Sequence, residues 1–229
     1  MVHFEKSQPA PECLAIEKDK KNGNYNCGNV LERLQQDFKN KCYLCEDTDI
    51  TNIEIEHFKP KSNFPHLIFE WGNLFFSCGY CNSVKSNDFH DILDCTNKEH
   101  NVDKNITYQI KIEQDLKEKI SIKSIKTNDV TTQNTVTLLL EIHQPENSTL
   151  NKKIASQNLR TKILENVNNF INYIEKYVEA KNENDNTKIQ TIKIIIQKEL
   201  SNSSKFTAFK RWIIAENKEI CDDFIQLLE

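Results

Sequence analysis

Two CxxC pairs constrain the fold of this chain more than any other feature of its sequence. Cys42 is paired with Cys45, and Cys78 is paired with Cys81. Each pair places two thiolates on one tight turn, and four thiolates form a usual ligand set of a closed, tetrahedral zinc site. Residues 46–77 lie between the pairs and leave room for two strands and a loop. We therefore expect a small module held by structural Zn²⁺, whose folding free energy comes largely from the metal.

The remaining four cysteines show no comparable spacing. The start of the chain has no apolar segment typical of a secretory signal, and no apolar run reaches the ~18–20 residues of a membrane span. We therefore expect a cytoplasmic protein with no membrane contact. In that compartment thiols stay reduced or bind metal rather than pair as disulfides. We expect these four residues to be small buried hydrophobic side chains: Cys13, Cys27, Cys95 and Cys221.

Composition favours a helical protein that does not bind nucleic acid through charge alone. Only 4 of the 229 residues are glycine and 28% are charged, which favours helices over a β-sandwich. The formal net charge is −4, whereas a protein that neutralises nucleic-acid phosphates by itself usually carries a basic surface. Either the basic residues cluster in the fold, or a partner supplies much of the affinity for the substrate.

Hydrophobic periodicity predicts an α+β fold that is mostly α. The segment ITNIEIEHF alternates as a strand does, and Gly79 suits the tight turn of the second CxxC pair. Residues 1–26 are polar and turn-rich. We expect two domains: 1–100, the cysteine module with an N-terminal extension, and 101–229, a small hairpin followed by a helical region. Helices are predicted at 27–40, 130–143, 149–180, 187–200 and 205–228, hairpin strands at 106–112 and 119–125, and a connecting loop at 181–187.

Four polar residues near the cysteine pairs suit phosphodiester hydrolysis. A neutral imidazole is the natural base near pH 7, so His57 can activate water. A divalent cation held by oxygen ligands stabilises charge on the leaving oxygen, and Glu56 with Asn82 can bind Mg²⁺ or Mn²⁺. A carbonyl oxygen must hold the base in one tautomer, and Asn73 can supply it. These four residues are the predicted catalytic set.

Each of these residues also has a purely structural interpretation. Neighbouring strand residues point to opposite faces, so Glu56 and His57 share a site only if the strand bends or ends there. Pro60 favours such an end. Asn82 can instead cap a helix that starts after the second CxxC pair. The order of the four residues relative to the two CxxC pairs favours the catalytic interpretation. Two further candidate metal ligands follow on the same predicted helix, Asp88 and His90.

The pattern resembles the HNH (ββα-metal) endonuclease family in its cysteine-clamped form. This resemblance implies a strand hairpin followed by a helix, with one catalytic metal. It assigns water activation to His57, metal binding to Glu56 and Asn82, orientation of the base to Asn73, and a place near the substrate phosphate to Lys85. The chain departs from the family in having Glu where Asp is commoner, and in lacking the glycines that often follow the proline. The motif residues are Cys42, Cys45, Glu56, His57, Pro60, Asn73, Leu74, Cys78, Cys81, Asn82 and Lys85.

Segments outside the motif resemble one branch of that family. The start of the chain and the stretch NDVTTQNTVTLLLEIHQPENSTLNKKIASQNLR are similar to the HNH subunit of Septu-type anti-phage defence systems, PtuB. The resemblance implies a bacterial antiviral nuclease subunit that works beside an ATPase, PtuA, and this would fit the acidic net charge. The helices of 101–229 would then bind that ATPase or form a homodimer within the complex. A packed bundle without a partner is the alternative.

Two other functions remain open from the sequence. A zinc-binding adaptor with an inactive nuclease site would need the cysteines but not His57. A stand-alone restriction-type endonuclease would need a basic recognition surface, and the acidic net charge counts against it. The substrate is open as well, because DNA and RNA both offer a phosphate and a sugar; DNA is preferred, with tRNA or another RNA as the alternative.

Overall fold

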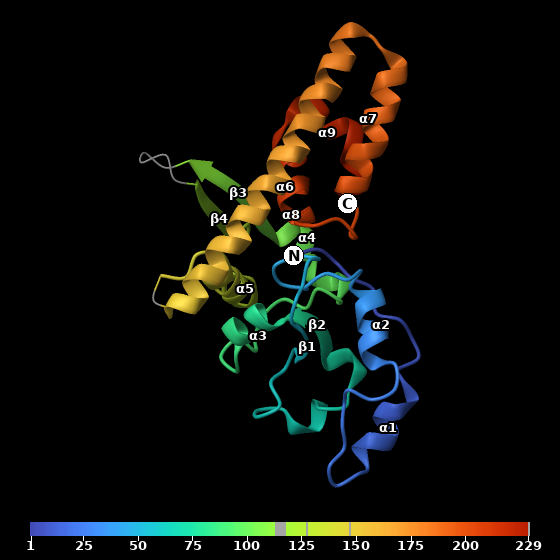
Figure 1. Cartoon of the computed structure of the whole chain (residues 1–229), viewed down its shortest axis with the longest axis vertical. Coiled ribbons are helices and arrows are strands. Elements are labelled where there is room, and N and C mark those ends of the chain that lie inside the picture. The colour runs from blue at the N-terminus through green and yellow to red at the C-terminus, as the bar shows by residue number, and fades with distance from the viewer. Residues whose placement is uncertain (113–117, 127, 147, 229) are drawn as a thin grey trace.

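Two antiparallel hairpins contribute the strands of a mostly helical α+β structure (Figure 1). The computed structural model describes residues 1–112, 118–126, 128–146 and 148–228. The first hairpin pairs β1 (Ile53–His57) with β2 (Leu74–Cys78), and the second pairs β3 (Ile106–Ile112) with β4 (Glu118–Ser124). The strand predicted within ITNIEIEHF and the predicted second hairpin are therefore confirmed.

A helix follows the first hairpin without a linker. This helix, α3 (Gly79–Lys85), packs against both β1 and β2. It begins inside the second CxxC pair, because Cys78 is its N-cap and the Cys78 sulfur accepts a hydrogen bond from the Cys81 amide at 3.4 Å. Two strands and a helix thus meet at the cysteine pair, which fixes the start of the helix relative to the end of β2.

The first part of the chain is more ordered and more apolar in the structure than its composition indicates. Residues 1–26 contain a helix, α1 (Glu12–Lys18), and bury Met1, Val2 and Phe4. The description of this segment as polar and turn-rich was therefore incomplete, since its few apolar side chains lack a periodic pattern yet enter the core. The next helix, α2 (Val30–Asp37), lies within the predicted range 27–40.

Helices make up the described part of the chain after β4, and shorter helices lie before it. A short helix, α4 (Val102–Asn105), precedes β3, and the 3-10 helices of the described residues lie at Pro65–Leu67, Trp71–Asn73, Lys98–His100 and Ile225–Leu227. The longer helices after β4 are α5 (Val130–His143), α6 (Leu150–Glu183), α7 (Asn186–Glu199), α8 (Thr207–Glu216) and α9 (Lys218–Phe224). Among the described residues, no helix is both long and apolar enough to cross a membrane.

Two details of these helices differ from the prediction. The loop predicted at 181–187 is only a tight turn, because α6 continues to Glu183, Asn184 adopts a left-handed conformation, and Asp185 caps α7. The single helix predicted at 205–228 is divided, because the Asn217 side chain accepts a hydrogen bond from the Glu219 amide at 3.2 Å and starts a new helix. In both places a short polar side chain makes a cap where the composition indicated a loop or a continuous helix.

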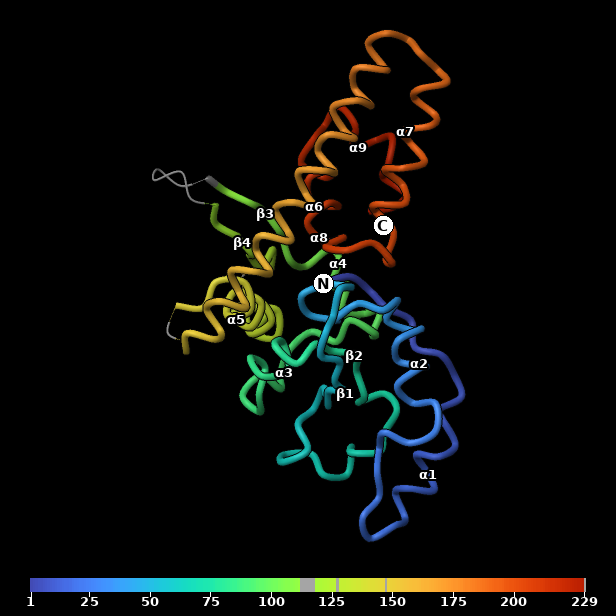
Figure 2. Tube along the Cα trace, in the orientation of Figure 1, coloured from blue at the N-terminus to red at the C-terminus, as the bar shows by residue number. Residues whose placement is uncertain are grey.

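The apolar side chains form two clusters. The larger cluster joins the N-terminal segment, the first hairpin, the second hairpin, α5 and the first half of α6. The smaller cluster lies between the second half of α6, α7, α8 and α9, in the arm at the top of Figure 1. The trace in Figure 2 places the N-terminus near α4 and α8, where the His3 amide donates a hydrogen bond to Asp103 at 3.0 Å.

Candidate active site and metal centre

The two CxxC pairs meet in one buried cluster. The sulfur atoms of Cys42, Cys45, Cys78 and Cys81 all lie within 4.8 Å of one another. Thiolates bound to Zn²⁺ at about 2.3 Å on a tetrahedron lie about 3.8 Å apart, so the four sulfurs fit this ion with little movement. The cluster can therefore hold a metal ion such as zinc.

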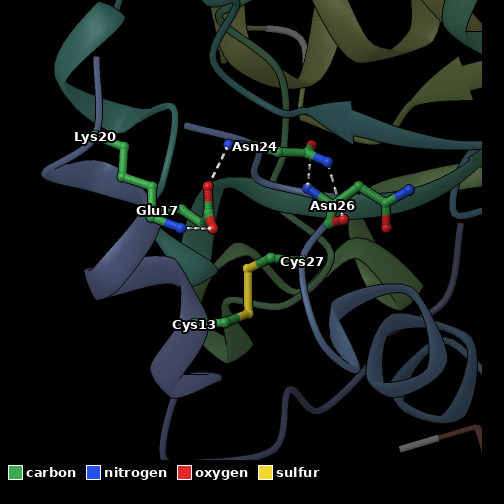
Figure 3. Close-up of a disulfide and its surroundings, with 6 residues drawn as sticks. All are labelled: Cys13, Glu17, Lys20, Asn24, Asn26 and Cys27. Atoms are coloured by element: carbon green, nitrogen blue, oxygen red, sulfur yellow. Dashed lines mark hydrogen bonds and ion pairs between the residues drawn. A yellow bond between two sulfur atoms is a disulfide. The ribbon is translucent and has the colours of Figure 1, made fainter. Parts of the chain in front are cut away.

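Two of the four remaining cysteines form a disulfide, which corrects the expectation that all four are free. Cys13 of α1 is bonded to Cys27, with Cα atoms 6.0 Å apart (Figure 3). The expectation rested on the redox state of the cytoplasm, whereas the structure shows that the loop after α1 folds back over the helix and brings the two thiols together. Cys95 and Cys221 are free; Cys95 is fully buried and Cys221 is half-buried.

A cavity of about 490 Å³ opens between β1, α3 and the loop that carries Tyr25. Three of the four predicted catalytic residues line it: Glu56, His57 and Asn82. Asn73 lies outside the lining. A carboxylate that the sequence analysis did not single out, Glu54, lines the cavity as well.

His57 reaches the cavity because it is the last residue of β1, where the strand pairing ends. Its side chain is held on two sides. The Nε2 atom lies 3.0 Å from the carbonyl oxygen of Ile68, and the ring meets the Tyr25 ring edge to face, with centroids 4.6 Å apart. Burial lowers the pKa of His57 below its ordinary value. A neutral imidazole that donates from Nε2 to Ile68 keeps Nδ1 as a proton acceptor.

Glu56 is buried beside α3 and is paired with Lys85. The Lys85 ammonium lies 2.7 Å from the Glu56 carboxylate and 3.3 Å from the His57 carbonyl oxygen, and the Lys85 side chain is fully buried. Burial raises the pKa of Glu56, although the Lys85 charge opposes this rise. The family resemblance predicts Lys85 near a substrate phosphate, whereas in the structure its ammonium group contacts Glu56 and the His57 carbonyl oxygen inside the protein.

Asn82 lies in the middle of α3 and contacts Glu54 of β1. Its side-chain nitrogen donates a hydrogen bond to the Glu54 carboxylate. The N-cap of α3 is Cys78, so the alternative role of Asn82 as a helix cap was wrong. Glu54 and Glu56 share one face of β1 because they are two residues apart, and this spacing is the sequence signal that could have identified Glu54.

Gly79 allows this close packing of α3 on β1. A Cβ atom at this position would lie 2.8 Å from a Glu54 carboxylate oxygen and 2.3 Å from the side-chain nitrogen of Asn52. The tight turn of the second CxxC pair is one reason for a glycine at position 79, and this close approach is a second. A larger residue would displace the side chains of Asn52 and Glu54, and Glu54 is the carboxylate that Asn82 contacts.

Asn73 fastens the loop that supports His57 rather than contacting the imidazole. Its side-chain oxygen accepts a hydrogen bond from the Lys59 amide at 2.7 Å, and its side-chain nitrogen donates to the Lys59 and Leu67 carbonyl oxygens at 3.1 Å each. Ile68, whose carbonyl oxygen meets His57, follows Leu67 directly. Asn73 therefore acts on the imidazole through the 59–68 loop.

The two further candidate metal ligands are placed outside this cavity. Asp88 accepts a hydrogen bond from the Ser86 hydroxyl at 2.7 Å, and the His90 carbonyl oxygen accepts one from the Lys59 ammonium at 2.5 Å. Neither side chain is among the residues that line the 490 Å³ cavity. The structure therefore brings together Glu54, Glu56, His57 and Asn82, without Asp88 or His90.

The fold and the site define a mostly helical α+β protein with a four-cysteine cluster beside a polar cavity. The chain is similar to a curated protein from Bacillus thuringiensis, the Septu protein PtuB, with 34% identity over 96 residues. The aligned part covers 37% of this chain and 37% of that protein, so the match spans little more than a third of the relative's length. No protein-family model matches the chain, and no solved structure matches it.

Proposed function

We propose that this protein is a metal-dependent HNH endonuclease subunit of a Septu-like bacterial anti-phage defence complex. One observation carries the proposal: Glu56, His57 and Asn82 line a single cavity, and Asn82 directly follows Cys81 of the four-cysteine cluster. In this proposal residues 1–100 form the nuclease module with structural Zn²⁺, and residues 101–229 form the partner-binding region. The reaction is hydrolysis of a phosphodiester bond in nucleic acid, with DNA preferred over tRNA or another RNA.

His57 is the general base in this proposal. Its Nε2 donates to the Ile68 carbonyl oxygen, so Nδ1 takes a proton from the attacking water. The Tyr25 ring and the Ile68 carbonyl oxygen together fix the plane of the imidazole. The low pKa caused by burial keeps the ring neutral, and therefore able to accept a proton, near neutral pH.

The oxygen atoms of Glu56 and Asn82 are the proposed ligands of Mg²⁺ or Mn²⁺. The residues fit a hard cation in chemistry, because they offer one carboxylate and one amide oxygen. The Asn82 nitrogen is already turned toward Glu54, which directs the amide oxygen of Asn82 away from that carboxylate. When bound, such an ion supplies positive charge that stabilises the leaving oxygen.

The defence role and the partner rest on the similarity to PtuB. The matched part covers only 37% of each chain, so the partner, an ATPase like PtuA, is proposed from the relative's class alone. A net charge of −4 supports a partner that presents or gates the nucleic acid. The helical arm of α6 and α7 is the proposed contact for this ATPase or for a second copy of the chain.

A zinc-binding adaptor is the second candidate, and the Glu56–Lys85 ion pair favours it. An ammonium group at 2.7 Å competes with a metal ion for the Glu56 carboxylate. An adaptor would keep the four cysteines and the buried ion pair but would cut nothing. A stand-alone restriction-type endonuclease has no such observation in its favour.

Cleavage assays with and without the ATPase distinguish these candidates. Purified protein is incubated with plasmid DNA or total tRNA and with Mg²⁺ or Mn²⁺, alone and with a PtuA-like ATPase. We expect cutting of one polymer, with a requirement for the ATPase if that partner gates the substrate. Folded, zinc-loaded protein that cuts neither polymer under any of these conditions would favour the adaptor.

A further inference from the structure

We propose that Tyr25 is a positioning residue for His57, and that the Cys13–Cys27 disulfide holds Tyr25 in place. This inference rests on the proposed function of His57 as a base. Tyr25 lies far from β1 in the sequence, and its ring stands against the imidazole with an interplanar angle of 86° and a centroid distance of 4.6 Å. Edge-to-face pairs of this geometry are attractive beyond the area they bury.

The hydrogen bond to Ile68 leaves one motion of the imidazole free. The ring can still turn about its Cβ–Cγ bond within the range that one hydrogen bond of 3.0 Å at Nε2 tolerates. The Tyr25 ring lies against the imidazole and blocks this rotation. Both residues line the 490 Å³ cavity, so their contact lies within the candidate site.

Tyr25 is itself held by a loop that is fastened to α1 on both sides. Before Tyr25, the Asn24 amide donates a hydrogen bond to the Glu17 carboxylate at 2.9 Å (Figure 3). After Tyr25, Cys27 is bonded to Cys13 of α1. Within the loop, the Asn26 amide donates to the Asn24 side-chain oxygen at 3.0 Å. Among the described contacts of this loop with α1, the disulfide is the attachment that follows Tyr25.

Two glycines show how closely this loop packs against α1. A Cβ atom at Gly23 would lie 1.9 Å from the Glu17 carbonyl oxygen. Gly28 has a φ of +51°, and a Cβ atom there would lie 3.2 Å from the Cys13 sulfur. Outside the loop, the Lys61 ammonium lies 5.1 Å from the centre of the Tyr25 ring. The ring is thus placed by backbone packing, by a covalent bond and by a cation–π contact.

Reduction of the disulfide would remove one attachment. A dithiol reductant transfers two electrons and two protons to the Cys13–Cys27 pair: the S–S bond breaks, two thiols form, and the reductant becomes a disulfide. The loop is then held to α1 by Glu17 alone among the described side-chain contacts, through the Asn24 amide and the Lys20 ammonium, and both of these contacts lie before Tyr25. The position of Tyr25 against His57 should therefore depend on the redox state of the full chain.

Kinetics of three variants test the positioning role. We expect Tyr25→Leu to lower kcat by about 10- to 100-fold with little change in KM, because the base loses its orientation while the substrate still binds. Tyr25→Phe keeps the ring and should retain most of the activity. Cys13→Ser should lower kcat as Tyr25→Leu does, whereas the matched variant Cys221→Ser should not. A wild-type kcat in Tyr25→Leu would overturn the proposal.

Reduction of the disulfide in the wild-type chain and in Tyr25→Leu tests whether the disulfide affects kcat through Tyr25. The dithiol should lower kcat of the wild-type chain but should not lower kcat of Tyr25→Leu further, because both changes remove the same contact. The zinc content is measured after each treatment, so that loss of metal is not counted as loss of positioning. An equal loss of kcat in both proteins, with zinc retained, would show that the disulfide acts through something other than Tyr25.

Nuclear magnetic resonance separates this proposal from the proposed nuclease function. In the oxidised protein we expect a nuclear Overhauser effect between ring protons of Tyr25 and His57, and we expect it to vanish in Cys13→Ser. Its absence from the oxidised protein would overturn the positioning role. If the effect is present but no variant or metal condition gives cleavage, the contact stands and the nuclease proposal fails.

Discussion

The Lys85 ammonium lies 2.7 Å from the Glu56 carboxylate, and both side chains are almost completely buried. Two charges can remain in the interior because each compensates the other, and the His57 carbonyl oxygen accepts a further hydrogen bond from Lys85. The pair links the last turn of α3 to the end of β1, so it also fixes the helix relative to the candidate base.

Removing Lys85 alone should strongly destabilise the protein. In Lys85→Met the Glu56 carboxylate loses its partner, and breaking one half of a buried pair costs about 3–5 kcal/mol. Urea denaturation followed by circular dichroism measures the change. Lys188→Met is the matched control, because that lysine pairs with Glu183 at the surface, with 45% of its side chain exposed, and should matter much less. Equal effects of the two substitutions would contradict the buried-pair interpretation.

The cysteine cluster should bind one zinc ion that the fold requires. Cys42→Ser and Cys81→Ser each remove one of the four converging sulfurs, so zinc content should fall and the module should unfold. Inductively coupled plasma mass spectrometry measures the zinc, and circular dichroism measures the folding. Cys95→Ser tests a buried cysteine outside the cluster and should keep the zinc. Well-folded wild-type protein with no zinc would rule out this site.

Loss of the Asn73 side chain should loosen the 59–68 loop and so disturb His57 indirectly. Asn73→Ala removes the three hydrogen bonds to Lys59 and Leu67, and we expect a loss of about 1–3 kcal/mol in the free energy of unfolding. Hydrogen exchange should be faster in this loop than in the wild-type chain. Asn63→Ala, on the exposed part of the same loop, is the control. Unchanged exchange in Asn73→Ala would mean that the loop does not depend on these bonds.

A buried histidine should make the protein sensitive to acid. His143 is 1% exposed, and burial, aided by the nearby N-terminal ammonium, lowers its pKa from 6.5 to about 3. Between these two values the unfolded chain binds a proton that the folded chain does not. The stabilising effect of neutral His143 is therefore complete above pH 6.5 and is lost as the pH falls toward 3, by up to about 1.4 kcal/mol per pH unit.

His143→Phe tests this dependence. The ring already packs edge to face on Phe209, with centroids 5.8 Å apart, so an aromatic replacement retains part of the packing. The slope of unfolding free energy against pH should be shallower in this variant than in the wild-type chain. His66→Gln, at an exposed position, should leave the slope unchanged. A wild-type slope in His143→Phe would assign the acid sensitivity to other groups.

Much of the fold follows from local patterns. The alternation in ITNIEIEHF predicted β1, and apolar spacing predicted α5 at the residues where the structure has it. The tight turn at Asn184 and the helix break at Asn217 depend on single polar side chains, which composition cannot distinguish from a loop or from a continuous helix. The α1 helix is short and carries one buried residue, Leu14, so it leaves almost no periodic signal.

The candidate site could be predicted only as far as residue types reveal it. Spacing and residue type drew attention to Glu56, His57 and Asn82, which line one cavity. They could not indicate Tyr25, because this contact joins a loop near α1 to the end of β1. They also could not predict the burial of Lys85, since a lysine after a CxxC pair usually lies in solvent. Contacts between distant segments, rather than local patterns, decide both positions.

The most direct test of the account compares His57→Ala with the wild-type protein in a cleavage assay with Mg²⁺ or Mn²⁺ and the proposed ATPase partner. His57 is not one of the four clustered cysteines, so the variant should keep its fold and its zinc while losing cleavage of the substrate. His66→Ala, at an exposed histidine, is the matched control and should cut normally. Loss of cleavage in the first variant alone, with zinc retained, is the result that the account predicts. Normal cleavage by His57→Ala would contradict the assignment of this residue as the base.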